Sequence, residues 1–334
     1  MKLAILAIES SCDETSAAVI YDGKILANVV ATQYIHEKYG GIVPELASRA
    51  HQQNIIPVVA RALEDANIQK SELKAVAFTK GPGLLGALLV GVSFAKSFAL
   101  GLGVPLIEVN HMQAHILAHF IEDPKPAFPF LCLTVSGGHT QIVRVSDHLT
   151  MEVIGQTLDD AVGEAFDKSA KLLGLPYPGG PLIDKLAQEG DPDAYSFPEV
   201  EMRELNFSFS GIKTAIMYFL REKTKNQPDF VENNMSDICA SIQKTLIGIL
   251  MKKLRRAARE TGISEIAIAG GVSANSGLRK AVMEEAEKSG WNVYIPRFEY
   301  CTDNAAMIAI AAHYKFLKGE FAGQDVSPDP RMTI

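Results

Sequence analysis

The hydrophobic positions in the first third of the chain form short buried runs separated by longer helical patterns. Continuous or alternating apolar runs of this length predict strands, whereas apolar residues that recur every three or four positions predict helices. In chain order the pattern predicts strands at 2–9, 17–23 and 24–32, a helix at 45–66, a strand at 73–80, a helix at 84–104, a strand at 104–110 and a helix from 111. These elements make up a mixed α/β unit.

The same order of elements starts again after the proline-rich connector "EDPKPAFP" at residues 122–129. The pattern there predicts strands at 130–135, 140–147 and 150–157, a helix-rich stretch at about 157–260, a strand at 265–271, a helix at 273–290, a strand at 292–296 and a helix at 303–319. We therefore expect a first unit at 1–125 and a second at 126–302 with a helical insertion at about 157–260. The last helix, at about 303–320, is expected to pack back on the first unit.

Two such α/β units in one chain resemble the actin, sugar-kinase and Hsp70 superfamily, whose fold is RNase H-like. The resemblance implies a nucleotide cleft between the units, faced by the turn between the first two strands of each. Those turns are "ESSCDET" and "VSGGHT", with "AGGVSAN" as a third loop. Glycine-rich turns suit a phosphate because their backbone N–H groups can approach it closely.

Charge and composition narrow the class of protein. The 334 residues carry a formal net charge of −7 and are 47% hydrophobic, which suits two sizeable cores and argues against broad, nonspecific nucleic-acid binding. A local basic patch stays open. Its best candidate is the run "MKKLRRAARE", with a solvated helix face as the alternative; the cations are Lys252, Lys253, Arg255, Arg256 and Arg259.

Features of the sequence also indicate the cellular location. The four cysteines are scattered without a CxxC pair, and the N-terminal run "MKLAILAI" is too short for a signal peptide. Residues 84–104 are nearly long enough to span a membrane, but Lys96, two serines and four glycines favour a buried helix. We therefore expect a soluble, cytoplasmic protein with no membrane attachment.

The stretch "VNHMQAHILAHF" places His111, His115 and His119 four residues apart, so that all three share one face of a helix. Two histidines at positions i and i+4 behind a strand end leave a metal site and core packing as the alternatives. The glutamate of an HExxH zinc protease is missing, and two imidazoles need a carboxylate from elsewhere. Asp303 in "YCTDNAAM" is a candidate, although an aspartate there could instead cap the last helix.

The segment "GPGLLG" matches the dinucleotide-binding pattern GxGxxG through Gly81, Gly83 and Gly86, with Glu108 in the next strand. Two features argue against a nicotinamide cofactor. The segment follows the fourth strand rather than the first, and the surrounding elements do not continue as alternating strands and helices. We expect instead a tight turn that lets a strand and a helix pack closely.

A third group of polar residues lies in "LDDAVGEAFDKSAKLLG", where Asp160, Glu164 and Asp167 would share one helical face. That face is either solvated or, beside the "YPGGP" turn, able to hydrogen-bond a ribose or another polar substrate. Ser136 in "SGGHT" and Asn275 in "GGVSAN" are further candidate contacts beside the backbone donors of those loops.

Taken together, motifs across nearly the whole chain resemble the bacterial TsaD family of tRNA threonylcarbamoyladenosine transferases, once misnamed O-sialoglycoprotein endopeptidases. The motifs are "IESSCDETS", "GGIVPELASRAH", "GPGLLGALLVG", "NHMQAH", "VSGGHTQIV", "DDAVGEAFDKSAKLLGLPYPGGP", "NFSFSGIKTA", "AGGVSANSGLR" and "YCTDNAAMIA". The historic protease interpretation fails because the HExxH glutamate is missing.

The resemblance implies transfer of threonylcarbamoyl from threonylcarbamoyl-AMP to N6 of adenosine 37, beside the anticodon, in tRNAs that read codons beginning with A. It implies one divalent metal, iron or zinc, held by His111, His115 and Asp303, and it gives His119 no role. It also assigns the substrate phosphate to one loop, formed by Thr134, Val135, Ser136, Gly137 and Gly138. The other substrate contacts that it implies are Asp167, Gly180, Asp184 and Asn275.

The donor in that reaction is a mixed anhydride, so its carbonyl is already activated and no covalent enzyme intermediate is expected. Asp13 and Glu9 are candidate bases, with structural support of the first turn as the alternative role. The expected partners are tRNA and proteins of the TsaB type, an inactive paralogue, and the TsaE type, an ATPase. ATP or ADP is a further nucleotide that the cleft could hold.

Two other functions suit the same fold. One is an ATP-dependent kinase or ATPase, but Ser136 stands where such enzymes usually present an aspartate in the second phosphate turn. The other is a non-catalytic nucleotide-binding scaffold, which has no need of three metal ligands.

Overall fold

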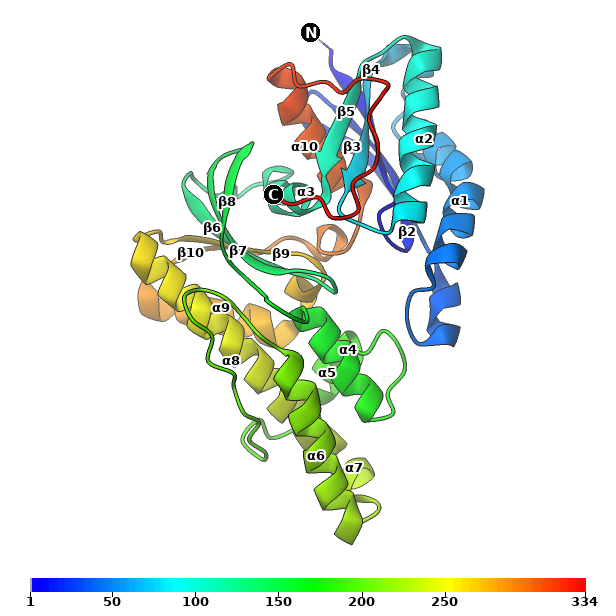
Figure 1. The fold of residues 1–334 in the computed structure, drawn as a ribbon. Coiled ribbons are helices and arrows are strands. Elements are labelled where there is room, and N and C mark those ends of the chain that lie inside the picture. Colours follow the sequence, from blue (N-terminus) through cyan, green and yellow to red (C-terminus); the bar gives the residue numbers. More distant parts are fainter. Residues whose placement is uncertain (1) are drawn as a thin grey trace. The chain divides into compact units, whose positions relative to one another are not determined.

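The computed structural model describes residues 2–334, and the chain divides into two compact units. The first unit contains the residues up to 125, 147–151 and 296–334, and the second contains 126–146 and 152–295. Each unit is built around a five-stranded sheet with its own hydrophobic core (Figure 1).

The sheet of the first unit has the strand order β3-β2-β1-β4-β5. Its elements are β1 (Ala4–Glu9), β2 (Glu14–Tyr21), β3 (Lys24–Thr32), the 3-10 helix η1 (Tyr34–Tyr39), α1 (Pro44–Asp65), η2 (Lys70–Glu72), β4 (Leu73–Gly81), α2 (Leu85–Leu102), β5 (Leu106–Asn110), α3 (His111–Leu117), η3 (Ala118–Phe120), η5 (Phe298–Tyr300) and α10 (Ala305–Leu317). β1 runs antiparallel to β2 and parallel to β4, and β4 runs parallel to β5. The parallel pairs need crossover connections, which α1 and α2 supply.

Helices cover this first sheet. All six residues of β1 are buried, which explains why its sequence is a continuous hydrophobic run rather than an alternating one. Leu6 and Ile8 share a core with residues of α1 and α2. The last helix, α10, packs against β1, β2 and β3 and also against α3. The segment that precedes α10 is thereby brought close to the histidine helix, although the two are far apart in sequence.

The second unit repeats this arrangement, with the strand order β10-β9-β6-β7-β8. Its elements are β6 (Phe130–Val135), β7 (Thr140–Asp147), β8 (Thr150–Gln156), α4 (Val162–Leu172), α5 (Gly180–Ala187), α6 (Ser210–Asn226), α7 (Phe230–Asn233), α8 (Met235–Thr261), β9 (Glu265–Ala269), η4 (Gly271–Ala274), α9 (Ser276–Ser289) and β10 (Asn292–Tyr294). β6 runs antiparallel to β7 and parallel to β9, and β9 runs parallel to β10.

The two sheets thus share one topology. In each, the first strand is central, the second and third lie on one side of it, and the fourth and fifth lie on the other. The predicted duplicated α/β fold is confirmed at this level, although few residue identities repeat. Helices α4 to α8 occupy most of the stretch from 157 to 260, where a helix-rich segment was predicted.

Helix α2 corresponds to the apolar stretch that could be mistaken for a membrane span. Among the described helices, it is the one whose length and composition would allow a crossing. It packs against α1 and β4, and Ala87, Leu88, Val92, Ala95 and Ala99 are buried. Membrane insertion would expose these contacts to lipid, so the packing favours the globular alternative.

A single carboxylate holds the start of α6 in the second unit. Asp159 accepts hydrogen bonds from the backbone N–H groups of Phe209, at 2.8 Å, and Ser210, at 3.3 Å. The hydroxyl groups of Ser208 and Ser210 donate to the same side chain, at 2.5 and 2.8 Å. Burial opposes the charge of Asp159, but these donors outweigh it and lower the pKa of the carboxyl group.

We expect Asp159→Ala to lower the free energy of unfolding by about 1–2 kcal/mol, because the substitution removes a charged cap of the helix. Since the folded-state pKa is below the unfolded value, this stabilisation is present above about pH 4 and is lost as the pH falls through the folded pKa. Urea unfolding at several pH values measures both effects. Glu222→Ala, which removes an exposed carboxylate from the same helix, should change the stability by less than about 0.5 kcal/mol.

Candidate metal centre and substrate loop

The chain turns from β5 into α3 at Asn110, and this turn sets the position of the first histidine. The side-chain oxygen of Asn110 accepts from the backbone N–H groups of Met112, at 2.9 Å, and Gln113, at 3.1 Å. The helix therefore begins at His111, and His115 lies one turn later on the same face. Both side chains are buried, with at most 8% of either residue exposed.

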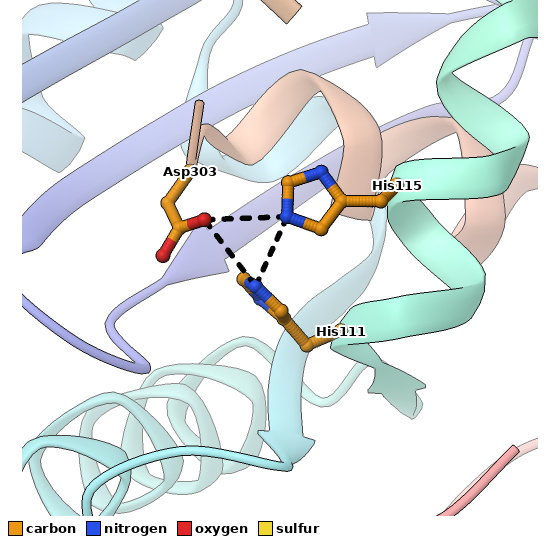
Figure 2. Close-up of side chains that lie close together, drawn as sticks. All are labelled: His111, His115 and Asp303. Carbon is orange, nitrogen blue, oxygen red and sulfur yellow. Dashed lines mark hydrogen bonds and ion pairs between the residues drawn. The ribbon is translucent and has the colours of Figure 1, made fainter. Parts of the chain in front are cut away.

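The third residue of the cluster comes from the segment before α10. Asn304, not Asp303, caps that helix, because its side chain accepts from the N–H of Met307. The helix-cap alternative for Asp303 is therefore wrong, and its carboxylate is left to face α3. Asp303 Oδ1 lies 3.3 Å from Nε2 of His111 and 3.2 Å from Nε2 of His115, as Figure 2 shows.

The three facing atoms have the spacing that a metal requires. The two histidine Nε2 atoms are 3.2 Å apart, so the three atoms form a nearly equilateral triangle. Ligands at about 2.0–2.1 Å from a tetrahedral ion lie about 3.3 Å from one another. The triangle therefore fits one face of a tetrahedral iron or zinc site, and it leaves the fourth position open for a substrate group or water.

Glu9 orients His111 from the opposite side. Its carboxylate is fully buried at the end of β1 and lies 3.0 Å from Nδ1 of His111. The hydroxyl of Thr79 and the backbone N–H of Ser11 also donate to this carboxylate. With the Nδ1 proton held by Glu9, Nε2 of His111 faces Asp303 and His115 and is the atom that would bind a metal once it has lost its proton. The contacts of Glu9 favour this positioning role, and its role as a base stays a prediction.

Burial and charge together set the protonation of the cluster. Burial by itself disfavours a charged imidazole, but the carboxylates of Asp303 and Glu9 raise the pKa of His111 well above its usual value. Burial, with the neighbouring charge of His111, lowers the pKa of His115. Burial opposes the charge of Asp303, but His111 outweighs it and lowers the pKa of that carboxyl group. The cluster therefore combines an anionic carboxylate, a neutral His115 and a His111 that favours its charged form, and a divalent cation would bind with loss of the Nε2 proton of His111.

The turn between β1 and β2 contains Asp13, the second candidate base, and it is flanked by two residues that the sequence did not single out, Glu14 at the start of β2 and His51 of α1. Burial, then the charges of Asp303 and Asp13, raise the pKa of Glu14 to about 10, so Glu14 keeps its proton at neutral pH. His51 of α1 is fully buried, with Nδ1 2.8 Å from the hydroxyl of Thr15 and Nε2 3.0 Å from the carbonyl oxygen of Cys12. Helix α1 therefore holds this turn in place.

The predicted substrate loop joins β6 to β7 in the second unit. Thr134 and Val135 lie at the end of β6 and are fully buried, so they support the loop from below and present no surface to a ligand. Ser136 closes a tight turn, because its N–H donates to the carbonyl of His139 at 2.8 Å and its hydroxyl accepts from the N–H of His139 at 3.1 Å. Gly137 and Gly138 are exposed, with nothing within 4 Å of where a side chain would begin.

The other predicted substrate residues make separate hydrogen bonds near the start of α5 and of α9. Asp167 accepts from the N–H groups of Gly179 and Gly180, and burial raises the pKa of its carboxyl group despite these bonds. Asp184 accepts from the N–H and hydroxyl of Ser276, at 2.9 and 2.7 Å. Asn275 caps α9 through the N–H of Leu278 and donates to Gln243. These side chains hold the site together, so their substrate contacts stay predictions.

The three carboxylates expected on one helical face separate into different roles. Asp160 precedes α4, and both Asp160 and Glu164 pair with Lys168, at 2.6 and 2.9 Å. Asp167 alone faces the glycine turn. The structure therefore does not contain the single solvated face that was one of the two alternatives for these carboxylates.

The glycines of "GPGLLG" are packed against protein. A Cβ atom at Gly81 would lie 1.8 Å from the carbonyl oxygen of Asp329, one at Gly83 would lie 2.6 Å from that of Ser11, and one at Gly86 would lie 2.3 Å from the hydroxyl oxygen of Ser48. Their backbone therefore has no space for a dinucleotide, and the close-packing interpretation of this segment is confirmed. His119 lies in η3, beyond the end of α3, and is not part of the metal-ligand cluster.

Comparison with known proteins identifies the family. A model of the TsaD family, described as tRNA N6-adenosine threonylcarbamoyltransferase, matches residues 24–310. A protein of that name from Cytophaga hutchinsonii is 68% identical over 334 residues, which cover 100% of this chain and 97% of the relative. The chain belongs to the tRNA N6-adenosine threonylcarbamoyltransferase family. A relative of the same name from Porphyromonas gingivalis is 57% identical and is matched over 99% of both chains.

Solved structures agree with the duplicated fold of this threonylcarbamoyltransferase family member. Full-length HypF, in a phosphate- and nucleotide-bound form, is similar with a TM-score of 0.65 at 16% identity, over 96% of this chain and 47% of HypF. ROK hexokinase from Thermus thermophilus is similar with a TM-score of 0.51 at 16% identity, over 96% and 100%. Both likenesses concern the fold alone, and they confirm the predicted duplicated α/β fold.

The contact between Glu9 and His111 leads to a prediction for metal affinity. We expect Glu9→Gln to weaken the binding of the metal about 10- to 100-fold, because the neutral amide is a poorer acceptor for the Nδ1 proton of His111. Competition with a chelator, read out by elemental analysis, measures the change. Glu108→Gln is a matched control in the same sheet, since Glu108 pairs with Lys80 at 2.9 Å and should leave metal affinity unaltered.

Proposed function

We propose that this chain transfers threonylcarbamoyl from threonylcarbamoyl-AMP to N6 of adenosine 37 in tRNAs that read codons beginning with A, with release of AMP. The observation that carries the proposal is the buried triangle of His111, His115 and Asp303 in a chain of this family. A divalent metal held there, iron or zinc, would act as a Lewis acid toward the activated carbonyl or anchor the threonyl group.

The reaction needs no nucleophilic side chain. The N6 amine attacks the threonylcarbamoyl carbonyl carbon, a C–N bond forms, and the C–O bond to the phosphate of AMP breaks. AMP leaves with the electron pair, and the amine loses a proton. Because an exocyclic amine is a poor nucleophile, holding the two reactants together is the main task of the protein, and such orientation can lower a barrier by roughly 7–11 kcal/mol at the extreme.

The protein groups proposed for binding are those of the substrate loop. The exposed backbone N–H groups of Gly137 and Gly138 would donate to the phosphate of the adenylate and so stabilise charge on the leaving group, while Ser136 closes the turn that presents them. Asp167, Gly180, Asp184 and Asn275 are proposed to contact the nucleoside, directly or by holding neighbouring backbone groups. Asp13 remains the candidate base, while Glu9 is engaged with His111.

We also propose that the enzyme works in the cytoplasm with partner proteins of the TsaB and TsaE type. The formal charge of −7 supports a requirement for partner proteins in tRNA binding, because an acidic chain repels the phosphates of tRNA on average. The kinase and scaffold alternatives have no support among the relatives, which carry the transferase name. The same proposal includes ATP or ADP as a further nucleotide that the chain binds.

A transfer assay tests the proposal directly. The purified chain and partners are incubated with threonylcarbamoyl-AMP and an unmodified tRNA transcript, and the digested nucleosides are measured by mass spectrometry. We expect threonylcarbamoyladenosine to form only when adenosine occupies position 37, and a transcript with guanosine there is the control. Consumption of the adenylate without a modified nucleoside would refute the proposal.

A further inference from the structure

The basic run singled out in the sequence is largely neutralised in the structure. On α8, Lys252 pairs with Glu201, Arg255 with Glu285 and Arg256 with Glu260. The ammonium group of Lys253 donates to the carbonyl oxygens of Met202 and Glu204, both at 2.7 Å. Within residues 2–334, Arg259 alone of the run has no acidic or carbonyl partner, so α8 offers little positive charge to a polyanion.

Helix α6, in contrast to α8, carries exposed cations that have no acidic partners within residues 2–334. Lys213, Arg221 and Lys225 are exposed, and within residues 2–334 no ion pair engages any of them. At about 100° per residue, Tyr218, Arg221 and Lys225 fall within about 60° of one another, opposite the buried Ile212, Ile216 and Leu220. Lys213 lies at the start of the helix, about 120° around it from Lys225 and next to the row of buried residues. The only acidic residue of α6 is Glu222.

Two exposed apolar side chains lie among these cations. Tyr218 is 60% exposed and Met217 is 43% exposed, both on the same side of α6 as Arg221. Exposed aromatic rings next to unpaired cations are typical of surfaces that bind single-stranded nucleic acid, since the ring stacks on a base while the cations contact phosphates.

The start of α6 is tied to the substrate loop through short contacts within the second unit. Asp159 caps α6, and three residues later the chain enters α4, where the N–H of Gly163 donates to the carbonyl of Ser136 at 3.2 Å. A Cβ atom at Gly163 would lie 2.6 Å from that carbonyl oxygen, so the loop and α4 are in close contact. The basic side of α6 therefore starts beside the loop and leads away from it along the helix that Figure 1 labels.

We propose that the basic side of α6, formed by Tyr218, Arg221 and Lys225, together with Lys213 at the start of the helix, binds the RNA backbone and an unpaired base next to the target adenosine. This inference rests on the proposed function, because it takes tRNA as the substrate. Lys213 and Lys225 are separated by about 18 Å along the helix, which is about the length of five stacked nucleotides at ~3.4 Å each. The side chains and the spacing match a single-stranded loop better than a compact anion.

A set of charge-removing variants tests the proposal in the full chain with its partner proteins. We expect Lys213→Ala/Arg221→Ala/Lys225→Ala to raise the KM for tRNA about tenfold or more, while the KM for threonylcarbamoyl-AMP stays unchanged. The logarithmic dependence of the tRNA Kd on salt should also become less steep by about 2, since each contact to a single strand contributes about 0.7. The control Lys24→Ala/Lys74→Ala/Lys288→Ala removes the same charge from exposed sites elsewhere and should leave both quantities unaltered.

Two substitutions of Tyr218 test whether its aromatic ring contributes to tRNA binding. Tyr218→Ala should weaken tRNA binding about fivefold or more, whereas Tyr218→Phe should retain it, because stacking needs the ring and not the hydroxyl. Equal tRNA binding by the α6 variants and the wild type would overturn the proposal. So would a loss of partner-protein binding with tRNA affinity unchanged, which would assign the surface to an acidic protein.

Direct measurement of tRNA binding, by anisotropy of a labelled transcript, keeps this proposal separate from the proposed function. If the wild-type chain bound tRNA through α6 but produced no modified nucleoside, the reaction would be wrong and the surface correct. If the variant that lacks all three cations modified tRNA at the wild-type rate, the proposed α6 surface would be wrong and the proposed reaction correct.

Discussion

Replacing both histidines of the triangle, His111→Ala/His115→Ala, is expected to abolish metal binding and to lower the rate of threonylcarbamoyl transfer by about a thousandfold or more. Two of the three atoms that define the site are removed, and a single carboxylate does not hold a divalent ion at micromolar concentrations. Lewis-acid stabilisation of several kcal/mol corresponds to a rate factor of this size.

The double variant leaves Glu9 and Asp303 without their histidine partners, so its stability needs a check. Asp303→Asn is nearly isosteric and removes the carboxylate charge, and it should also lose the metal and the activity while keeping the fold. His119→Gln, a histidine of the same stretch outside the cluster, should retain both. Elemental analysis, circular dichroism and the transfer assay together decide the matter. Transfer at the wild-type rate by a folded, metal-free variant would show that the triangle has no catalytic role.

A methyl group at Gly137 is expected to block the adenylate without disturbing the protein. Nothing lies within 4 Å of the position where a Cβ atom would stand, and the residue is exposed, so Gly137→Ala should fold with an unchanged melting temperature. A phosphate held by the N–H groups of the loop would occupy the same space. We therefore expect the KM for threonylcarbamoyl-AMP to rise about tenfold or more.

Gly101→Ala is the matched control for this prediction. Gly101 lies in α2, and its Cβ position is also open. The substitution should leave the kinetics unchanged and add up to about 1 kcal/mol of stability, because alanine favours a helix over glycine. An unaltered KM in Gly137→Ala would mean that the adenylate binds elsewhere.

The fold was predictable because its determinants are local. Buried strands such as β1 and β6 are continuous apolar runs, and the repeated order of strands and helices is visible without any residue identity. The pair His111 and His115 could be identified for the same reason, since their spacing depends only on the helix. Asp303 is 188 residues from His115, so the sequence offered it only as a candidate with helix capping as the alternative, and the resemblance to a family favoured the metal.

The missed features depend on tertiary packing. The position of Glu9 against His111, the raised pKa of Glu14 and the anchoring of a turn by His51 each join segments that are remote in sequence. The basic run on α8 likewise could not be interpreted without the fold. Its cations resemble a nucleic-acid patch in the sequence, but the acidic partners come from the loop before α6 and from α8 and α9. Unpaired charge can be identified only when the fold is known.

We propose that the triangle of His111, His115 and Asp303 holds the metal on which transfer to tRNA depends. The most direct measurement removes metal from the wild-type chain with a chelator and returns iron or zinc in steps, with bound metal and transfer rate determined on the same samples. The rate should fall to the background without metal and rise in proportion to bound metal, up to one equivalent per chain. A rate that stays at the wild-type level in the metal-free chain would contradict the claim.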